Sequence, residues 1–147
     1  MVIDFWKLVT ILVAGFVAWV SWSQYSVNKE KFKLDLFEKR FQVFAATRKF
    51  LSVVLQKANI MIEDLFEYRA NTAEAEFLFD TDITDYLKKI DEMALSLHTL
   101  NETMKPLAGE ERAEKAKAIS EHLRWLTGQL PELKPKFSPY MKFKTWK

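Results

Sequence analysis

Two carboxylates are the most suggestive chemical feature of this chain. Asp80 and Asp82 follow the apolar run Phe77-Leu78-Phe79. Such a pair can share the work on a phosphate ester, with one carboxylate attacking and the other transferring a proton. That chemistry requires a strand that delivers the pair, a Mg²⁺ ion and further basic and acidic motifs. The structural alternative is helix capping, because aspartate is a preferred N-cap residue.

The letters of residues 77–84 match the nucleophile loop of haloacid-dehalogenase-type phosphatases. The chain has neither the strands nor the length which that fold needs, and a motif without its structural context is only a letter match. We therefore interpret Asp80 and Asp82 as a capping cluster. The enzyme alternative predicts a Mg²⁺-dependent phosphatase activity that Asp80→Asn abolishes.

Metal and nucleophile patterns are incomplete. Asp80, Asp82 and Asp85 are spaced like calcium ligands, but no glycine lies nearby and Asp91 stands where an EF-hand has its glutamate. The two histidines, His98 and His122, form no Glu-x-x-His pair of the kind that di-iron bundles use. The chain has no cysteine. We expect no metal, no cofactor and no catalytic residue, and we predict that the protein is not an enzyme.

The elements that surround these residues begin with an uncharged segment. Residues 8–28 carry no charge, and Lys7 and Lys29 flank them. Twenty-one residues of helix span about 30 Å, the hydrocarbon thickness of a bilayer. Aromatic residues lie where the interfaces would be: Trp6, Trp19, Trp22 and Tyr25. We predict a transmembrane helix in the anchor 1–28. A cleaved signal peptide is disfavoured by Asp4 and by the poor cleavage pattern around Ser21 and Ser23.

A ridge of small residues runs along this predicted membrane helix. Thr10, Ala14 and Ala18 recur every four residues, with Gly15 beside them. Small residues let two helix backbones approach closely, which favours self-association, although they are also common in membrane helices generally.

Flanking charge predicts the orientation. Lys29, Lys31 and Lys33 follow the segment, whereas Asp4 offsets Lys7 before it. The side richer in Lys and Arg stays in the cytoplasm, so we expect the N-terminus outside and about 119 residues in the cytosol of a bacterium. We expect these three lysines to contact lipid phosphates at the inner (cytoplasmic) membrane.

The remaining chain is predicted to be all-α. Gly (3) and Pro (4) are rare, and three of the prolines come after residue 130. Apolar periodicity predicts one amphipathic, coiled-coil-like helix from residue 29 to about 71 that continues the membrane helix, a second over 82–105 and a third from about 110 to 130. We predict an antiparallel three-helix bundle over 29–130 that stands on the membrane helix.

Residues 131–147 form a basic aromatic tail in which three prolines are expected to forbid a continuous helix. This tail has three interpretations: it lies on an anionic leaflet, it binds single-stranded nucleic acid, or it packs its aromatic rings along the bundle. Nucleic acid is the least favoured because the tail has no arginine and residues 50–133 carry nine basic and sixteen acidic groups. The candidate contact residues are Lys134, Lys136, Phe137, Tyr140, Lys142, Phe143, Lys144 and Trp146.

Four stretches carry a family resemblance: KLDLFEKRF at 33–41, ATRKFL at 46–51, FLF at 77–79 and WLTGQLP at 125–131. In these the chain resembles a group of small uncharacterised bacterial proteins with one N-terminal membrane segment followed by helices. The resemblance implies an anchored helical protein and no activity. Effectors of bacterial antiphage and retron systems are similar in build only.

The function predicted from the sequence is a non-enzymatic membrane protein that self-assembles into homo-oligomers through its helices. Its bundle would bind a cytosolic protein, and clustering of its membrane helices could make it a membrane-perturbing effector. The alternative is a passive anchor or adaptor that tethers a partner to the membrane and exists as a monomer or a hetero-complex.

Overall fold

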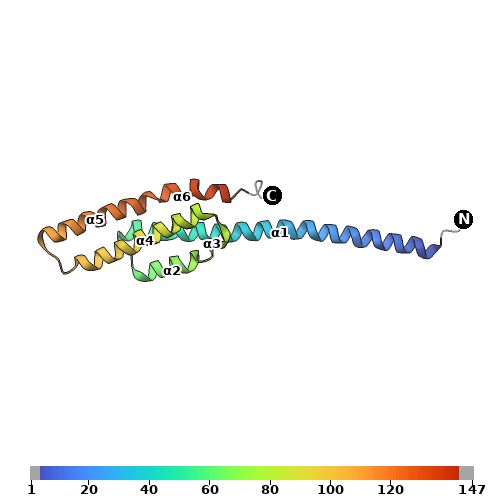
Figure 1. Cartoon of the computed structure of the whole chain (residues 1–147), viewed down its shortest axis with the longest axis horizontal. Coiled ribbons are helices and arrows are strands. Elements are labelled where there is room, and N and C mark those ends of the chain that lie inside the picture. The colour runs from blue at the N-terminus through green and yellow to red at the C-terminus, as the bar shows by residue number, and fades with distance from the viewer. Residues whose placement is uncertain (1–3, 143–147) are drawn as a thin grey trace. The chain divides into compact units, whose positions relative to one another are not determined.

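The computed structural model describes residues 4–142, and this range is helical with no strand. Six α-helices and one 3-10 helix follow one another: α1 (Phe5–Lys57), α2 (Ile62–Thr72), α3 (Ala75–Leu78), α4 (Thr81–Met104), α5 (Gly109–Gly128), α6 (Leu130–Phe137) and η1 (Ser138–Tyr140) (Figure 1). The all-α prediction is therefore confirmed for the described residues. They fall into two compact units, one up to Leu36 and the other from Phe37 onward.

The first unit is the N-terminal part of α1. Helix α1 runs unbroken through the uncharged segment and continues beyond it, as the absence of Gly and Pro in this helix after residue 15 predicted. In the described part of the chain, α1 is the one helix with the length and apolar composition to cross a membrane, and no residue of its most apolar stretch is buried. Large apolar side chains point outward along it, among them Leu12, Phe16 and Trp19.

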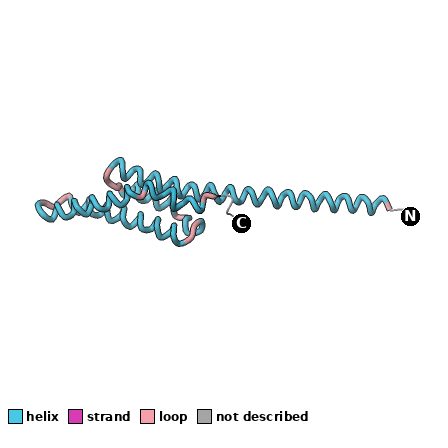
Figure 2. The backbone as a smooth tube through the Cα atoms, turned by 90° about the horizontal axis from the view of Figure 1, so that it is seen from above, coloured by secondary structure: helices cyan, strands magenta, loops and turns pink. Residues whose placement is uncertain are grey.

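The second unit is built around α4. This helix packs along α5 and also contacts α2 and α3, and α5 in turn contacts α6 (Figures 1 and 2). The apolar stripe of α4 is buried at Ile83, Leu87, Ile90, Ala94 and Leu97. Burial of this stripe fixes which side of α4 faces the other helices.

One face of α1 contributes to the core of this unit. Val43, Thr47, Phe50, Leu51 and Val54 are buried. Phe37, Phe41 and Phe44 in the same helix remain partly or largely exposed.

The prediction of one helix up to residue 71 was wrong. Helix α1 ends at Lys57, and Ala58 adopts a positive φ of 50° that breaks the helical path. The Asn59 side chain accepts hydrogen bonds from the Ile60 amide (2.7 Å) and the Asn101 amide (2.7 Å), which ties the break to α4. Tertiary contact thus interrupts a segment whose local sequence favours helix.

The tail was expected to form no continuous helix, and within its described part helix α6 ends at Phe137. Helix α6 accommodates Pro131 in its first turn, where a missing N–H costs nothing, and it carries Pro135 inside. The helix is only eight residues long, and it gives way to η1 at Ser138, before Pro139. Burial of Leu133 and Phe137 in the second unit stabilises this short helix.

Candidate functional site

The C-terminal segment docks on the second unit through aromatic packing. Phe137 is only 1% exposed. Its ring lies 5.5 Å from that of Phe44, with the planes at 63°, and 5.3 Å from that of Phe79, with the planes at 84°. Edge-to-face pairs of this kind add to the stabilisation from burial. This arrangement agrees with the third interpretation of the tail, in which its rings pack along the bundle.

A set of polar contacts reinforces this docking, and we call it the clasp: it joins Arg40, Asp80 and Asp82 to Tyr140. The Arg40 Nε donates to the Leu78 carbonyl (2.8 Å), and Nη1 donates to the Tyr140 carbonyl (3.2 Å). The guanidinium carbon also lies 5.8 Å from the centre of the Phe79 ring and 5.4 Å from that of Tyr140. Partial burial lowers the pKa of Arg40, while Tyr140 and Asp80 favour its charged form. Arg40 thus joins α1, the end of α3 and the C-terminal segment.

The two aspartates of the phosphatase-like motif belong to the same clasp. The Tyr140 hydroxyl lies 2.5 Å from Asp82 Oδ1 and 3.3 Å from Asp80 Oδ2, and it donates to these carboxylates. Asp80 occupies the N-cap position of α4 with an extended backbone, but its side chain makes no capping hydrogen bond. The segment before it is the short helix α3, so no strand delivers the pair. The structure therefore gives the aspartates a role in holding the C-terminal segment.

Tyr140 gives this clasp a measurable pH dependence. Burial and the neighbouring Asp82 and Asp80 raise the pKa of Tyr140 to about 12, from an ordinary value of 10. Because the folded pKa is the higher one, the contribution of the neutral phenol to stability is complete below pH 10 and is lost as the pH rises through 12. We expect the phenolate absorbance of the wild type minus that of Tyr140→Phe to appear near pH 12. In Asp82→Asn this midpoint should fall toward 10, and a wild-type midpoint already at 10 would disprove the clasp.

An aromatic groove lies beside the docked segment. We use this name for the hollow of about 320 Å³ that Phe37, Phe41, Phe44, Phe137 and Met141 line together with Arg48, Lys134 and Ser138. The rings of Phe37 and Phe41 stack at 6.0 Å, and those of Phe41 and Phe44 lie 5.9 Å apart. Its volume lies at the lower end of the range for small-molecule sites, about 300–1,000 Å³.

The charges around the aromatic groove are of one sign. Arg48 and Lys134 line it, and among the described residues no aspartate or glutamate does. Both side chains are exposed, and the Arg48 guanidinium lies 5.5 Å from the centre of the Phe44 ring. An apolar floor with two cations suits a ligand that has an apolar part and a negative charge.

Ser96 and His122 are far apart in the sequence, but their side chains meet between α4 and α5. Ser96 Oγ lies 3.0 Å from His122 Nε2, and His122 Nδ1 lies 2.8 Å from the Ala118 carbonyl. Because a carbonyl only accepts, Nδ1 carries the hydrogen, and Ser96 then donates to Nε2. A hydrolase also needs oxyanion donors and space for a substrate, and neither side chain lines the aromatic groove. We interpret the pair as a link between the two helices.

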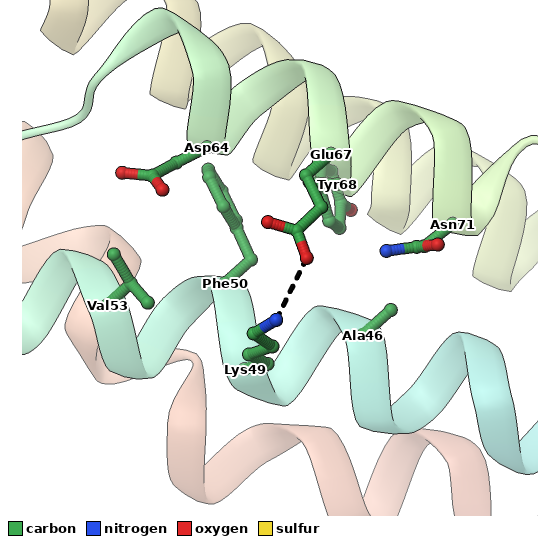
Figure 3. Close-up of a pocket in the computed structure, with 8 residues that line it drawn as sticks. All are labelled: Ala46, Lys49, Phe50, Val53, Asp64, Glu67, Tyr68 and Asn71. Atoms are coloured by element: carbon green, nitrogen blue, oxygen red, sulfur yellow. Dashed lines mark hydrogen bonds and ion pairs between the residues drawn. The ribbon is translucent and has the colours of Figure 1, made fainter.

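The pocket drawn in Figure 3 is too small for a ligand. It lies between α1 and α2, where Lys49 Nζ donates to Glu67 Oε1 at 2.8 Å and Phe50 and Tyr68 line its wall. Its volume of about 20 Å³ is close to that of one water site. The structure therefore assigns this pocket to the packing of α1 against α2.

The predicted membrane residues lie in the first unit. The four aromatic residues Trp6, Trp19, Trp22 and Tyr25 are exposed on α1, and so are Thr10, Ala14, Gly15 and Ala18 along its small-residue ridge. A Cβ added at Gly15 would meet nothing within 4 Å. Of the three juxtamembrane lysines, Lys29 and Lys31 are exposed, and Lys33 lies 3.9 Å from Glu30. The ridge is thus open to a neighbour.

The candidate residues of the tail lie in different surroundings. Lys134 lines the aromatic groove, Lys136 Nζ lies 4.5 Å from the centre of the Tyr86 ring, and Phe137 and Tyr140 hold the segment in place. Lys142 is exposed at the end of the described chain. Phe143, Lys144 and Trp146 lie outside the described residues.

Residues 4–142 contain no group of three or more His, Cys, Asp or Glu side chains that could hold a metal ion. Comparison with known protein families, characterised proteins and solved structures finds no match to this chain.

Proposed function

We propose that this chain is a non-enzymatic, single-pass membrane protein that self-assembles through its helices and presents its helical bundle to the cytosol. One observation carries the proposal: none of the residues in the most apolar stretch of α1 is buried. Exposed apolar surface on this scale is unfavourable in water, so it calls for lipid or for other copies of the chain.

The length and polarity of the segment favour lipid as the surrounding medium. Residues 8–28 are uncharged, and exposed aromatic residues lie toward both ends. The excess of lysine after residue 28 favours a cytosolic location for everything that follows. In this proposal the predicted domains are an anchor at 1–28, an antiparallel helical bundle at 29–130 and the basic tail at 131–147.

Self-assembly is supported by the small-residue ridge. Thr10, Ala14 and Ala18 share one face because they are four residues apart in a helix. The Thr10 hydroxyl donates to the Trp6 carbonyl (2.8 Å), which leaves no unpaired donor on that face. Close approach of two such faces gains van der Waals contact in lipid. If clustering of membrane helices perturbs the bilayer, the protein acts as an effector that depolarises its own membrane.

Replacing Ala14 and Ala18 with leucine tests this interface. Bulkier side chains hold the backbones apart, and we expect chemical crosslinking in membranes to show at least about tenfold less oligomer, the factor that corresponds to 1.4 kcal/mol. Any depolarisation of the membrane on expression should decrease together with the amount of oligomer. The control is Val13→Leu with Val17→Leu, which adds bulk on a neighbouring face. Unchanged assembly in the Ala14/Ala18 variant would refute this interface.

A passive adaptor is the alternative, and a specific observation favours it. Phe77 is 82% exposed on the short helix α3, and an exposed aromatic side chain is a common anchor for a protein partner. This function predicts a monomer or a hetero-complex and no harm on expression. Membrane potential in cells that express the wild type separates the two functions, because only the effector depolarises the membrane.

A further inference from the structure

We propose that the aromatic groove binds one acyl chain and the headgroup of an anionic phospholipid. The inference rests on the proposed function, because it makes the lipid bilayer that surrounds α1 the source of the ligand. It goes beyond that function by assigning to the bundle a lipid site of its own, separate from the membrane helix.

The apolar part of the site is continuous. The rings of Phe37, Phe41 and Phe44 follow one another along α1, and Phe137 closes the row from the docked segment. Phe41 keeps 44% of its surface exposed, so its ring can contact a ligand without any rearrangement of the core. An acyl chain that covers these rings removes apolar surface from water.

The polar part of the site selects negative charge. Arg48 and Lys134 are exposed, and no acidic residue of the range 4–142 lines the aromatic groove. Neither cation forms an ion pair with a described carboxylate. A phosphodiester headgroup can therefore approach both without breaking an ion pair to a described carboxylate, and arginine and lysine are the usual ligands of phosphate.

The size of the aromatic groove favours a lipid over a protein. A hollow of about 320 Å³ lies within the range of small-molecule sites, about 300–1,000 Å³, which suits one apolar chain. Chain connectivity favours the same ligand. Only eight residues separate Asn28 from Phe37, so anchoring at 8–28 would tether these phenylalanines to a bilayer. Of the amphiphiles with a negative charge, phospholipid is then the most concentrated.

The test uses the full chain in vesicles of phosphatidylcholine with a minor fraction of phosphatidylglycerol. The protein is extracted in a mild detergent, and native mass spectrometry counts the lipids that each chain retains. A phosphatidylglycerol with a photoreactive acyl chain then locates the site by crosslinking. We expect retained phosphatidylglycerol in excess of its share in the vesicle and crosslinks to peptides that contain Phe41 or Met141. Free glycerol phosphate should not compete, because it has no acyl chain.

Two variants separate charge from apolar contact. Each basic residue near an anionic headgroup contributes a factor of about five, so Arg48→Gln with Lys134→Gln should lower phosphatidylglycerol retention about 25-fold. Phe41→Ser should lower it about tenfold while circular dichroism shows an unchanged helix content. The matched control is Lys117→Gln with Arg124→Gln, which removes the same two charges from exposed positions of α5 and should leave retention unchanged.

Each outcome decides one claim. Equal retention in the groove variants and the control overturns the lipid site, and so do crosslinks confined to residues 8–28. Crosslinks that join the aromatic groove to another protein chain show that a second copy covers it, which also overturns the proposal. Failure of the proposed function looks different: the wild type leaves the vesicles in alkaline carbonate, whereas retention of phosphatidylglycerol from mixed micelles still depends on Arg48 and Lys134.

Discussion

Arginine at Val13 and Val17 is expected to release the chain from the membrane almost completely. Both valines lie near the middle of the uncharged segment and are 55% exposed, so their replacement removes little packing within the protein. Each arginine near the centre of a membrane helix costs about 2.5–3.5 kcal/mol of insertion free energy. Two of them should move the protein from the pellet to the supernatant in alkaline carbonate extraction.

The control for this variant is Ala116→Arg with Ser120→Arg. It adds the same two charges at the same spacing on exposed positions of α5. This control should stay in the membrane pellet with the wild type. If the Val13/Val17 variant also stays in the pellet, the segment is not inserted in the hydrocarbon layer.

Truncation of Phe137 is expected to be the most destabilising single change in the second unit. The side chain is buried between the rings of Phe44 and Phe79, and Phe→Ala at such a site costs about 3–5 kcal/mol of unfolding free energy. We expect a lower midpoint of urea denaturation followed by circular dichroism. Loss of the Phe137 ring should also release Tyr140 from its docked position, so its phenol should titrate near its ordinary pKa of 10.

Phe77→Ala is the matched control. It removes the same atoms from a side chain that is 82% exposed, so the unfolding free energy should change by less than about 0.5 kcal/mol. Equal effects of the two substitutions would mean that Phe137 is not docked in the core of this unit.

The sequence predicted α4 and α5 well because their apolar periodicity starts and stops where residues that favour helix ends occur. Helix α4 begins at Thr81, directly after the N-cap position of Asp80, and α5 ends at Gly128. Local propensity and burial point the same way in these helices, so periodicity alone located them.

The features that escaped prediction depend on contacts between residues far apart in the chain. The break after Lys57 is held by Asn59 and Asn101, and the docking of the tail by Arg40 and Tyr140. Sequence patterns such as periodicity are local, so they do not predict contacts between distant residues. The aromatic groove escaped prediction because it combines side chains of α1 with side chains of the C-terminal segment, which are far apart in the sequence.

The central claim is a single membrane span with the bundle on the cytosolic side, and one labelling measurement tests it most directly. The chain has no cysteine, so Val2→Cys and Ser120→Cys each introduce a unique thiol. We expect a membrane-impermeant maleimide to label Val2→Cys in intact cells and Ser120→Cys only after lysis. Labelling of Ser120→Cys in intact cells would contradict the account.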